Sequence, residues 1–427
     1  MRVILHSDLN AFYASVECLY RPELKKVPMA VCGDPLKRHG IVLAKNELAK
    51  KMGVKTGEAI WEAESKCPGL TLTAPQGRLY QRYSQLVRSI YEEYTPYVEP
   101  FGIDECWLDI TKTGRDGYET AEELRLRIRR EIGLTVSIGV SFNKIFAKLG
   151  SDLKKPDAVT EIRNEDFREI VWPLPVRNLL FVGRQTERKL ALINIKTIGD
   201  LAHCGPQFLQ QHLGKWGLLL WQSAMGLDKQ DVAKSGDYPP VKSVGNSMTA
   251  IRDLHAETEV KLIFTRLAEE VAMRLREEGL FCSTVQISLR DNELFSFERQ
   301  RKLSRPTQCT SVILKTAMSL YHDEHYRTRP LRSLGIRCVD LSWADKGQQE
   351  SFLPEAKSEA RWLEVERAVD GLRSRYGEEA ILRGRLLSDK ALSGLKSYTQ
   401  IDLPGKTLPG SNVSPHLKPA KIYREVV

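Results

Sequence analysis

The stretch FGIDECWLDI, residues 101–110, sets two adjacent carboxylates, Asp104 and Glu105, inside a run that is otherwise apolar enough for a buried strand. Neighbouring residues on a strand point to opposite faces of the sheet. Both acids can therefore project over the same end of a sheet only where the chain bends. We expect a hairpin at this point. The opening segment RVILHSD predicts a short buried strand that ends at Asp8.

The segments between Asp8 and residue 140 predict the order β-α-β-β-α-β, the split unit of ferredoxin-like folds. Helical spacing of apolar residues predicts one helix that ends before Pro96 and a second helix after the hairpin. A half-buried strand should follow the second helix, because its apolar residues alternate. The residues that carry these patterns are Tyr80, Tyr83, Val87, Ile90, Tyr91 and Tyr94, then Ala121, Leu124, Ile128 and Ile132, then Leu134, Val136, Ile138 and Val140. In this order of elements the first strand delivers Asp8 to the end of the sheet that carries Asp104 and Glu105.

Length and composition indicate a protein of several globular domains. The chain has 427 residues, of which 42% are apolar and 28% charged, and this length suggests three or four domains. No apolar run reaches the length of about 18 residues that a membrane span needs. The eight cysteines are at least 14 positions apart, a spacing that excludes zinc-knuckle and redox pairs. We expect reduced thiols and a cytoplasmic protein.

The charge distribution indicates a polyanionic partner. The formal net charge is +9, and between Arg299 and Arg337 nine Lys or Arg residues stand against only Asp323 and Glu324. Clustering of this kind favours nucleic-acid contact, and the alternative is the solvated face of a sheet.

The remaining segments divide the chain. Residues 21–75 interrupt the β-α-β-β-α-β unit with a small α/β insertion. After Pro156 the pattern changes to short helices, one of them with a capping box between Thr197 and Asp200. Residues 234–247 have the composition of a linker. A helix near residues 260–278 and alternating strands follow, one with Val285, Ile287 and Leu289 on one side. The last 30 or so residues are expected to lack a core of their own.

Three carboxylates that converge repel one another unless cations lie between them. Mg²⁺ prefers oxygen ligands and is usually bound by one or two carboxylates together with substrate phosphates. Two such ions, about 3.5–4 Å apart, clamp the attacking and leaving oxygens of an in-line phosphoryl displacement. The alternative is a hairpin with solvent-exposed acids and no metal.

Three motifs in order, HSDLNAFYASVE, GIDECWLDI and VSIGVSFNKIFAKLGSDLKKPDA, closely resemble those of the Y-family translesion DNA polymerases. The resemblance covers about residues 1–345 and is nearest to UmuC and its relatives in Gram-positive bacteria. It implies an α+β right-hand polymerase with a ferredoxin-like βαββαβ palm, small fingers, a helical helix-hairpin-helix thumb and an α/β little finger. The expected boundaries are 1–20 and 76–165 for the palm, 21–75 for the fingers, 166–233 for the thumb, 234–244 for a linker, 245–345 for the little finger, and 346–427 for a partly flexible extension.

The resemblance also implies the metal ligands and the activity. Asp8 and Asp104 would bind or bridge two Mg²⁺ ions, Glu105 would complete the site that holds the primer 3′-OH metal, and the Leu9 backbone carbonyl would be a further ligand. Mn²⁺ can substitute for Mg²⁺ in such sites. Gly102 stands where the family usually has Ser. The implied function is low-fidelity, template-directed DNA synthesis past damaged bases in an SOS-type response.

The resemblance places several nucleotide contacts. Tyr13 holds the position of the steric gate that excludes a ribose 2′-OH, and Phe12 precedes it; packing into the palm is the alternative for such an aromatic. Where some family members have Thr, Tyr and Arg, this chain has Ala44, Glu47 and Lys50. Lys50 would replace the phosphate-binding Arg as a point charge. Further contacts fall at Lys45, Asn46 and Lys155; the last matches the lysine that reaches the triphosphate, and its alternative is a solvated lysine at a helix end.

Expected partners are primer-template DNA, dNTPs and a sliding clamp, with a recombinase filament or accessory subunit as a further possibility and no membrane. Gly183 lies in a segment that resembles a helix-hairpin-helix, although only one of the usual two glycines is present. The cations expected to contact DNA phosphates are Arg184, Arg188, Arg299, Arg301, Lys302, Arg305, Arg332 and Arg337. The clamp-binding peptide would be Gln400, Ile401, Asp402, Leu403 and Pro404, where an aromatic often replaces the proline; a random tail segment is the alternative.

Two other functions stay open at this point. A two-metal nuclease would use the same ions to cleave phosphodiesters, although Tyr13 and Lys155 favour a triphosphate substrate. A catalytically silent clamp- and DNA-binding accessory factor would need no intact acids, and all three acids are present.

Overall fold

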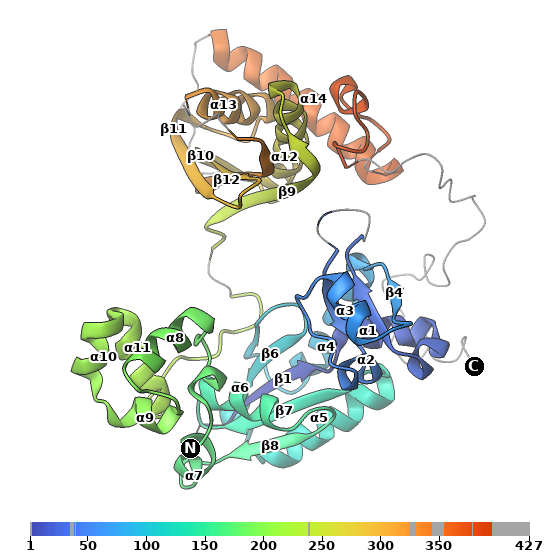
Figure 1. The fold of residues 1–427 in the computed structure, drawn as a ribbon. Helices are drawn as coiled ribbons and strands as arrows, with labels where there is room; N and C mark the ends of the chain where they lie inside the picture. Colours follow the sequence, from blue (N-terminus) through green and yellow to red (C-terminus); the bar gives the residue numbers. More distant parts are fainter. Residues whose placement is uncertain are drawn as a thin grey trace. The chain divides into compact units, whose positions relative to one another are not determined.

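A computed structural model describes residues 2–34, 38, 40–237, 240–323, 329–343, 354–377 and 379–394 of the chain. The chain divides into two compact units, one that holds Met1–Pro35 with Gly40–Tyr238 and one that holds Pro239–Ser411. Each unit has its own sheets and its own hydrophobic core, and each is described by itself (Figure 1).

The first unit is built on a five-stranded sheet in the order β5-β6-β1-β7-β8, which we call the palm sheet. All neighbouring strands are antiparallel except β7 and β8. With the helices α4 and α5, the chain order β1-α4-β5-β6-α5-β7 confirms the predicted β-α-β-β-α-β unit. The bounds are β1 Ile4–Leu9, α4 Gly77–Glu92, β5 Val98–Pro100, β6 Glu105–Asp109, α5 Gly117–Glu131, β7 Val136–Ser141 and β8 Val159–Ile162.

Helices cover both faces of the palm sheet. The apolar faces of α4 and α5 pack with Leu5 and Leu9 of β1 in one cluster. The opposite face carries α6, Lys144–Leu153, where Ile4 packs with Ala147. Because strand residues alternate, His6 and Asp8 share the α6 face with Ile4. The sheet therefore turns the predicted catalytic Asp8 toward α6.

The expectation that residues 134–140 form a half-buried strand was wrong, because all six residues of β7 are buried. The strand lies inside the sheet between β1 and β8 and is covered by α5 on one face and α6 on the other. At Gly139 the backbone of α6 comes so close that a Cβ atom would lie 1.9 Å from the Ala147 carbonyl oxygen. A glycine in the strand is what allows this approach.

Two smaller parts complete the first unit. The insertion after β1 holds a three-stranded sheet, order β3-β2-β4, over its own small core. Its elements are α1 Phe12–Tyr20, η1 Pro22–Lys26, β2 Met29–Cys32, β3 Val42–Lys45, α2 Glu47–Lys51, α3 Ile60–Lys66 and β4 Thr71–Thr73. After β8 come short helices, which are α7 Phe167–Val171, η3 Val176–Asn178, α8 Arg184–Leu192, α9 Ile198–His203, α10 Pro206–Leu213 and α11 Lys215–Ala224. The predicted capping box between Thr197 and Asp200 opens α9.

The second unit is a four-stranded antiparallel sheet, order β11-β10-β12-β9, with α12 and α13 packed on one face. Val285, Ile287 and Leu289 point into that core, as predicted. The bounds are β9 Ser243–Leu254, α12 Glu257–Glu277, β10 Leu280–Asp291, β11 Ser296–Thr307, α13 Thr310–Asp323 and β12 Leu331–Trp343.

A further helix, α14 Pro354–Tyr376, and the short η4 Gly384–Leu387 pack on the second unit. The guanidinium of Arg276 on α12 binds Glu366 at 2.7 Å and Asp370 at 2.6 Å. Leu386 and Leu392 join the core of the unit. The first part of the predicted C-terminal extension is therefore built onto this core.

All eight cysteines are free thiols, and seven of them are buried, in agreement with the expectation of reduced thiols. In the part of the chain that the structure describes, we find no helix of sufficient length and apolarity to cross a bilayer.

The close approach at Gly139 predicts that Gly139→Ala destabilises the protein by about 3 kcal/mol, since the backbone of α6 must shift to accept the methyl group. Gly77→Ala is the matched control, because its Cβ would meet no atom within 4 Å at the first residue of α4. Urea unfolding measures both variants. A Gly139→Ala protein as stable as Gly77→Ala would contradict the close packing of α6 on β7.

Candidate active site

The register of β1 and β6 brings two of the predicted carboxylates together. Asp8, near the end of β1, lies directly opposite Glu105, the first residue of β6. Asp104 is the residue before β6, and its carbonyl accepts a hydrogen bond of 3.0 Å from the Leu9 amide. Three acids separated by almost 100 positions in the chain thus meet at one end of the palm sheet, as the sequence predicts.

The bend before Asp104 depends on Gly102. This residue has φ +98°, a left-handed conformation that glycine adopts at no steric cost. A Cβ here would lie 3.6 Å from the Asp104 Oδ1, so space is available and the backbone conformation is the constraint. Gly102 therefore fits the turn that presents Asp104.

Helix α6 supplies the countercharge for these acids. The Asn143 side chain caps the helix by accepting a hydrogen bond from the Phe146 amide. Lys148 then reaches Glu105 at 3.0 Å, and Lys155, just after the helix, reaches Asp8 at 2.7 Å. Asp152 lies between the two lysines, at 3.5 Å from Lys148 and 2.8 Å from Lys155. Each carboxylate of the β1–β6 pair thus has a lysine of its own.

Burial and neighbouring charges shift the pKa values of the three acids differently. Burial raises the pKa of Asp8 to about 7 although Lys155 opposes this shift. Burial, followed by the charge of Glu105, also raises the pKa of Asp104. For Glu105 burial acts in the same direction, but the nearby His6 imidazole and the charge of Lys148 outweigh it and lower the pKa to about 2. Glu105 is the acid that remains ionised under all ordinary conditions.

His6, Lys148 and Asp152 belong to the site but were not predicted. His6 is fully buried, its Nδ1 lies 2.8 Å from the Ser151 Oγ, and its Nε2 lies 3.4 Å from a Glu105 oxygen. Burial is the main cause that lowers the pKa of His6, so the imidazole is held neutral. Two signals in the sequence were available: His6 precedes Asp8 by two residues and shares its face, and Lys148 and Asp152 are four residues apart on a helix.

The donor set fits a hard divalent cation. Asp8, Leu9 and Asp104 line a cavity of about 300 Å³ between the palm sheet and the insertion. Carboxylate and carbonyl oxygens are the ligands that Mg²⁺ prefers. Within the described residues, however, no group of three or more His, Cys, Asp or Glu side chains is gathered closely enough to hold a metal ion. Glu105 and Asp8 are instead paired with Lys148 and Lys155, which a bound cation would have to replace.

The same cavity gathers the predicted cationic nucleotide contacts. Lys45 and Lys50 line it from the insertion and Lys155 from the palm side. Lys45 lies 3.0 Å from the Thr56 Oγ1, and burial lowers its pKa. Lys50 is 3.3 Å from Glu47. Three ammonium groups around one cavity, beside an acidic floor, suit a polyanionic ligand such as a triphosphate.

The two aromatic residues at the start of α1 differ in environment. Phe12 is buried in the palm core and also lines the cavity. Tyr13 is partly exposed and stacks on Tyr80, with ring centroids 4.2 Å apart and an interplanar angle of 12°. Burial and the charge of Asp104 raise the pKa of Tyr13, which puts its hydroxyl in the electrostatic field of the acids. Of the two rings, that of Tyr13 is the more exposed to solvent.

Asn46, another predicted nucleotide contact, makes hydrogen bonds with its side chain to the backbone of the insertion. Its Oδ1 accepts from the amides of Met29 and Ala49, and its Nδ2 donates to the carbonyls of Leu24 and Val27. These bonds cap α2 and hold the strands around it. The amide has no hydrogen-bonding group left over for a ligand in this conformation.

The predicted helix-hairpin-helix residues lie at the start of α8. Gly183 is the residue before the helix, and a Cβ atom at this position would meet nothing within 4 Å. Arg184 is the first helical residue and is exposed, and Arg188 follows one turn later. Free amide groups at a helix start, next to an arginine, suit a phosphate.

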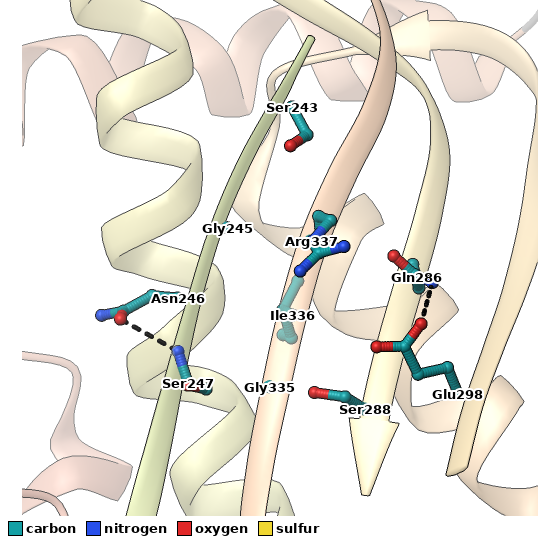
Figure 2. Close-up of a pocket in the computed structure, with 10 residues that line it drawn as sticks. All are labelled: Ser243, Gly245, Asn246, Ser247, Gln286, Ser288, Glu298, Gly335, Ile336 and Arg337. Carbon is teal, nitrogen blue, oxygen red and sulfur yellow. Dashed lines mark hydrogen bonds between the residues drawn. The ribbon is translucent and has the colours of Figure 1, made fainter. Parts of the chain in front are cut away.

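The sheet of the second unit has an open face opposite α12 and α13. Its central rows are Gly245, Arg337 and Gln286, then Ser247, Gly335 and Ser288. These side chains line a hollow of about 380 Å³ with Arg337 at its centre (Figure 2). A Cβ at Gly335 would lie 2.3 Å from the Ser288 Oγ. The glycine and serine residues in these rows therefore leave the hollow open.

Strand register divides the predicted DNA-binding cations between the two faces of this sheet. Lys302 pairs with Thr284 and Arg337 with Gln286, so both lie on the open face. Arg299 and Arg301 pair with the core residues Ile287 and Val285 and lie on the helix side, where Arg305 also binds Glu359 of α14. Arg332 lies at a shift in the register of β12 and is assigned to neither face. Arg301 is already bound to Asp323 and Ser319 of α13. Arg290, which was not predicted, shares the open face through its pairing with Ser333.

The predicted clamp-binding residues 400–404 lie outside the residues that the structure describes.

Fold and site together define a right-hand nucleotide polymerase: a ferredoxin-like sheet with three acids at one end, a cationic cavity beside them, a helical segment and a separate α/β unit. Family models agree with this class. Residues 7–152 match the impB/mucB/samB family, residues 241–351 match the C-terminal domain of that family, and residues 177–228 match the thumb domain of DNA polymerase iota.

Similar proteins agree as well. DNA polymerase IV of Acetivibrio thermocellus is 49% identical over 395 residues, which are 92% of this chain and 99% of the relative. DNA polymerase IV of Clostridium acetobutylicum is 32% identical over 394 residues, 90% of this chain and 98% of the relative. A solved chimera of Y-family DNA polymerases superimposes with a TM-score of 0.72 at 22% identity, over 80% of this chain and 99% of the chimera. The chain belongs to the Y family of DNA polymerases, the impB/mucB/samB family.

The raised pKa of Asp8 predicts a pH-dependent effect of metal on stability. Below about pH 7 the Asp8 carboxyl is protonated and a poor ligand, and above that value it is ionised. We expect MnCl₂ to raise the melting temperature more at pH 8 than at pH 6, and Asp8→Asn to remove most of the difference. Differential scanning fluorimetry measures the shift. An equal shift at both pH values, or a full shift in Asp8→Asn, would show that Asp8 is not a ligand.

Proposed function

We propose that this protein extends a DNA primer on a template, including a damaged template, by two-metal nucleotidyl transfer. The observation that carries the proposal is the β1–β6 register, which sets Asp8 opposite Glu105 with Asp104 beside them at the edge of a cationic cavity. We assign the palm to residues 1–20 and 76–165, the fingers to 21–75, the thumb to 166–233, a linker to 234–244, the little finger to 245–345 and an extension to 346–427.

The residues of the site have separate tasks in this proposal. Asp8, Asp104, Glu105 and the Leu9 carbonyl would hold two Mg²⁺ or Mn²⁺ ions, which supply charge neutralisation and lower the pKa of the primer hydroxyl when bound. His6 and Lys148 hold the Glu105 carboxylate in place through their contacts of 3.4 and 3.0 Å. Lys155, Lys45 and Lys50 would bind the triphosphate, and Tyr13 would exclude the ribose 2′-OH.

Tolerance of damaged templates follows from the size of the fingers. The insertion consists of a three-stranded sheet and short helices, so few side chains are available to test the shape of the nascent base pair. A cavity with a permissive wall accepts distorted templates at a cost in fidelity.

Two other readings of the same acids are less well supported. A two-metal nuclease needs no cationic triphosphate site, yet three lysines line the cavity beside Asp8. A catalytically silent accessory factor needs no metal ligands, yet Asp8, Asp104 and Glu105 are all in place.

The remaining contacts would hold DNA and replication partners. Arg184, Arg188 and the Gly183 turn would bind phosphates from the thumb, and the open face of the little finger would do so through Lys302, Arg337 and Arg290. Gln400, Ile401, Asp402, Leu403 and Pro404 would dock on a sliding clamp in the cytoplasm, which raises the effective concentration of the enzyme at the primer end. A recombinase filament or an accessory subunit is a further candidate partner.

Primer extension tests the proposal directly. Purified protein with Mg²⁺, a primed template and dNTPs should lengthen the primer, and Glu105→Gln should reduce the rate by about a thousandfold because several kcal/mol of charge stabilisation are lost. DNA affinity, measured by fluorescence anisotropy, should stay unchanged. Shortening of the primer without dNTPs would indicate a nuclease, and DNA binding without either reaction would indicate an accessory factor.

A second prediction concerns sugar selection. Tyr13→Ala should raise ribonucleotide incorporation on the order of 100-fold, the scale on which a pocket discriminates a small difference in size. Tyr13→Phe keeps the ring and serves as the control that should remain selective. Parallel extension assays with dNTPs and rNTPs give the ratio. An unchanged ratio in Tyr13→Ala would remove the steric gate from this position.

Arg337 and Arg301 lie on opposite faces of the little-finger sheet, which predicts that only Arg337 contributes to the salt dependence of DNA binding. Arg337 lies on the open face without an ion pair in the described part of the chain, whereas Arg301 is bound to α13. Arg337→Ala should reduce the slope of log affinity against log salt by about 0.9, the value for one lost phosphate contact, and Arg301→Ala should leave it unchanged. Anisotropy titrations between about 50 and 200 mM salt provide the slopes. Equal slopes for the two variants would refute the assignment of faces.

A further inference from the structure

Two large aromatic side chains of the thumb are exposed next to each other. Phe181, just before the α8 hairpin, and Trp216, the second residue of α11, have 56% and 59% of their surface accessible. Their ring centroids are 6.0 Å apart and the rings are tilted by 48°. The segment before α8 and the start of α11 thus contribute two exposed rings that lie side by side, which we call the aromatic pair.

The backbone turns Phe181 outward at a conformational cost. Its neighbours Leu180 and Val182 pack into the interior, while Phe181 itself has φ +70°. A bulky residue in the left-handed region is an outlier, and such strain persists where the surrounding structure enforces it. The folded chain gains little in return, because most of the ring remains in water. The positive φ belongs to a turn that is closed by a hydrogen bond of 3.1 Å from the Val182 amide to the Leu179 carbonyl. Glycine is the residue that such a turn favours at this position. The turn therefore does not account for a large exposed ring, which is available for a contact outside the protein.

The surroundings of the aromatic pair are positively charged. Residues 176–219 hold six Lys or Arg and two acids. Arg184 opens α8 three residues after Phe181, and Lys215 directly precedes Trp216. Neither cation has an ion pair or a side-chain hydrogen bond within the described residues, and Glu187 is the acid in the first turn of α8. An apolar patch with unpaired cations at its edge complements a polyanion that also has apolar surface.

We propose that the aromatic pair is a DNA contact of the thumb, in which the two rings lie against sugars and base edges in a duplex groove while Arg184 and Lys215 reach the flanking phosphates. This inference rests on the function proposed above. It adds an apolar contact to DNA binding by the thumb, which would otherwise involve phosphates alone. Apolar side chains that enter the minor groove are a known mode of binding to duplex DNA.

The geometry favours a duplex over a single strand. A base sandwiched between two rings needs parallel planes separated by about 7 Å, twice the usual stacking distance. Phe181 and Trp216 instead contact each other at a tilt of 48°, which leaves no slot between them. The two rings together form a protruding surface, which suits the groove of a duplex better than a single base.

Binding of the full-length chain to a primer-template duplex tests the inference. Phe181→Ala and Trp216→Ala should each weaken binding roughly tenfold, the effect of losing an aromatic contact with nucleic acid, with the salt dependence unchanged because no charge is removed. Leu192→Ala is the matched control, since Leu192 is 86% exposed on α8 and lies outside the pair. It should bind as the unmodified protein does.

Phe181→Gly separates a binding role from a structural one. Glycine relieves the left-handed strain, so this variant should melt at the same or a higher temperature and still lose affinity for the duplex. A lower melting temperature with unchanged affinity would assign Phe181 to folding and overturn the inference, as would a larger loss of affinity for single-stranded DNA than for the duplex. If the unmodified protein neither binds nor extends the duplex, the proposed function itself fails; if it does both and the pair variants match it, only this inference fails.

Discussion

The antiparallel register between β1 and β6 is the constraint on which the rest of the site depends. It sets Asp8 opposite Glu105 and, through the Leu9–Asp104 backbone bond, fixes the bend that carries Asp104. A slip of one residue would turn Asp8 to the other face of the sheet, into the core formed with α4 and α5. The register is strongly specified, because Leu5 and Leu9 must enter that core while Ile4 and His6 pack toward α6. Burial of apolar side chains therefore places the acids.

The approach of α6 to the sheet at Gly139 has a second consequence. It brings Lys148 and Lys155 within 3.0 Å of the two facing carboxylates, so the protein neutralises its own acidic cluster. His6 and Ser151 add a buried hydrogen bond behind Glu105. An acid held by a neutral imidazole and a lysine stays ionised, whereas Asp8, which is more buried, has a raised pKa. Two carboxylates that face each other thus differ in proton affinity, because Glu105 contacts His6 and Lys148 whereas Asp8 is more deeply buried.

Much of the first unit could be predicted from the sequence, because periodicity reports burial. The 3.6-residue pattern of Tyr80 to Tyr91 and the hairpin at Asp104 led to the correct order of elements. His6, Lys148 and Asp152 were missed because their role depends on which face α6 covers, and no local pattern reports that. The burial of β7 was underestimated for the same reason, since alternation along a strand does not show that a helix covers its second face. The charge run from Arg299 to Arg337 indicated a basic surface, but only the register separates Arg337 from Arg301.

In the proposed mechanism, Asp8, Asp104 and Glu105 would act together by sharing one cluster of cations. Anomalous diffraction from a crystal soaked in Mn²⁺ tests this most directly. The expected result is manganese within coordination distance of Asp8, Asp104 and Glu105, with Lys155 displaced from Asp8. A map without manganese at these acids, or with Asp8 still bound to Lys155 and remote from any ion, would contradict it.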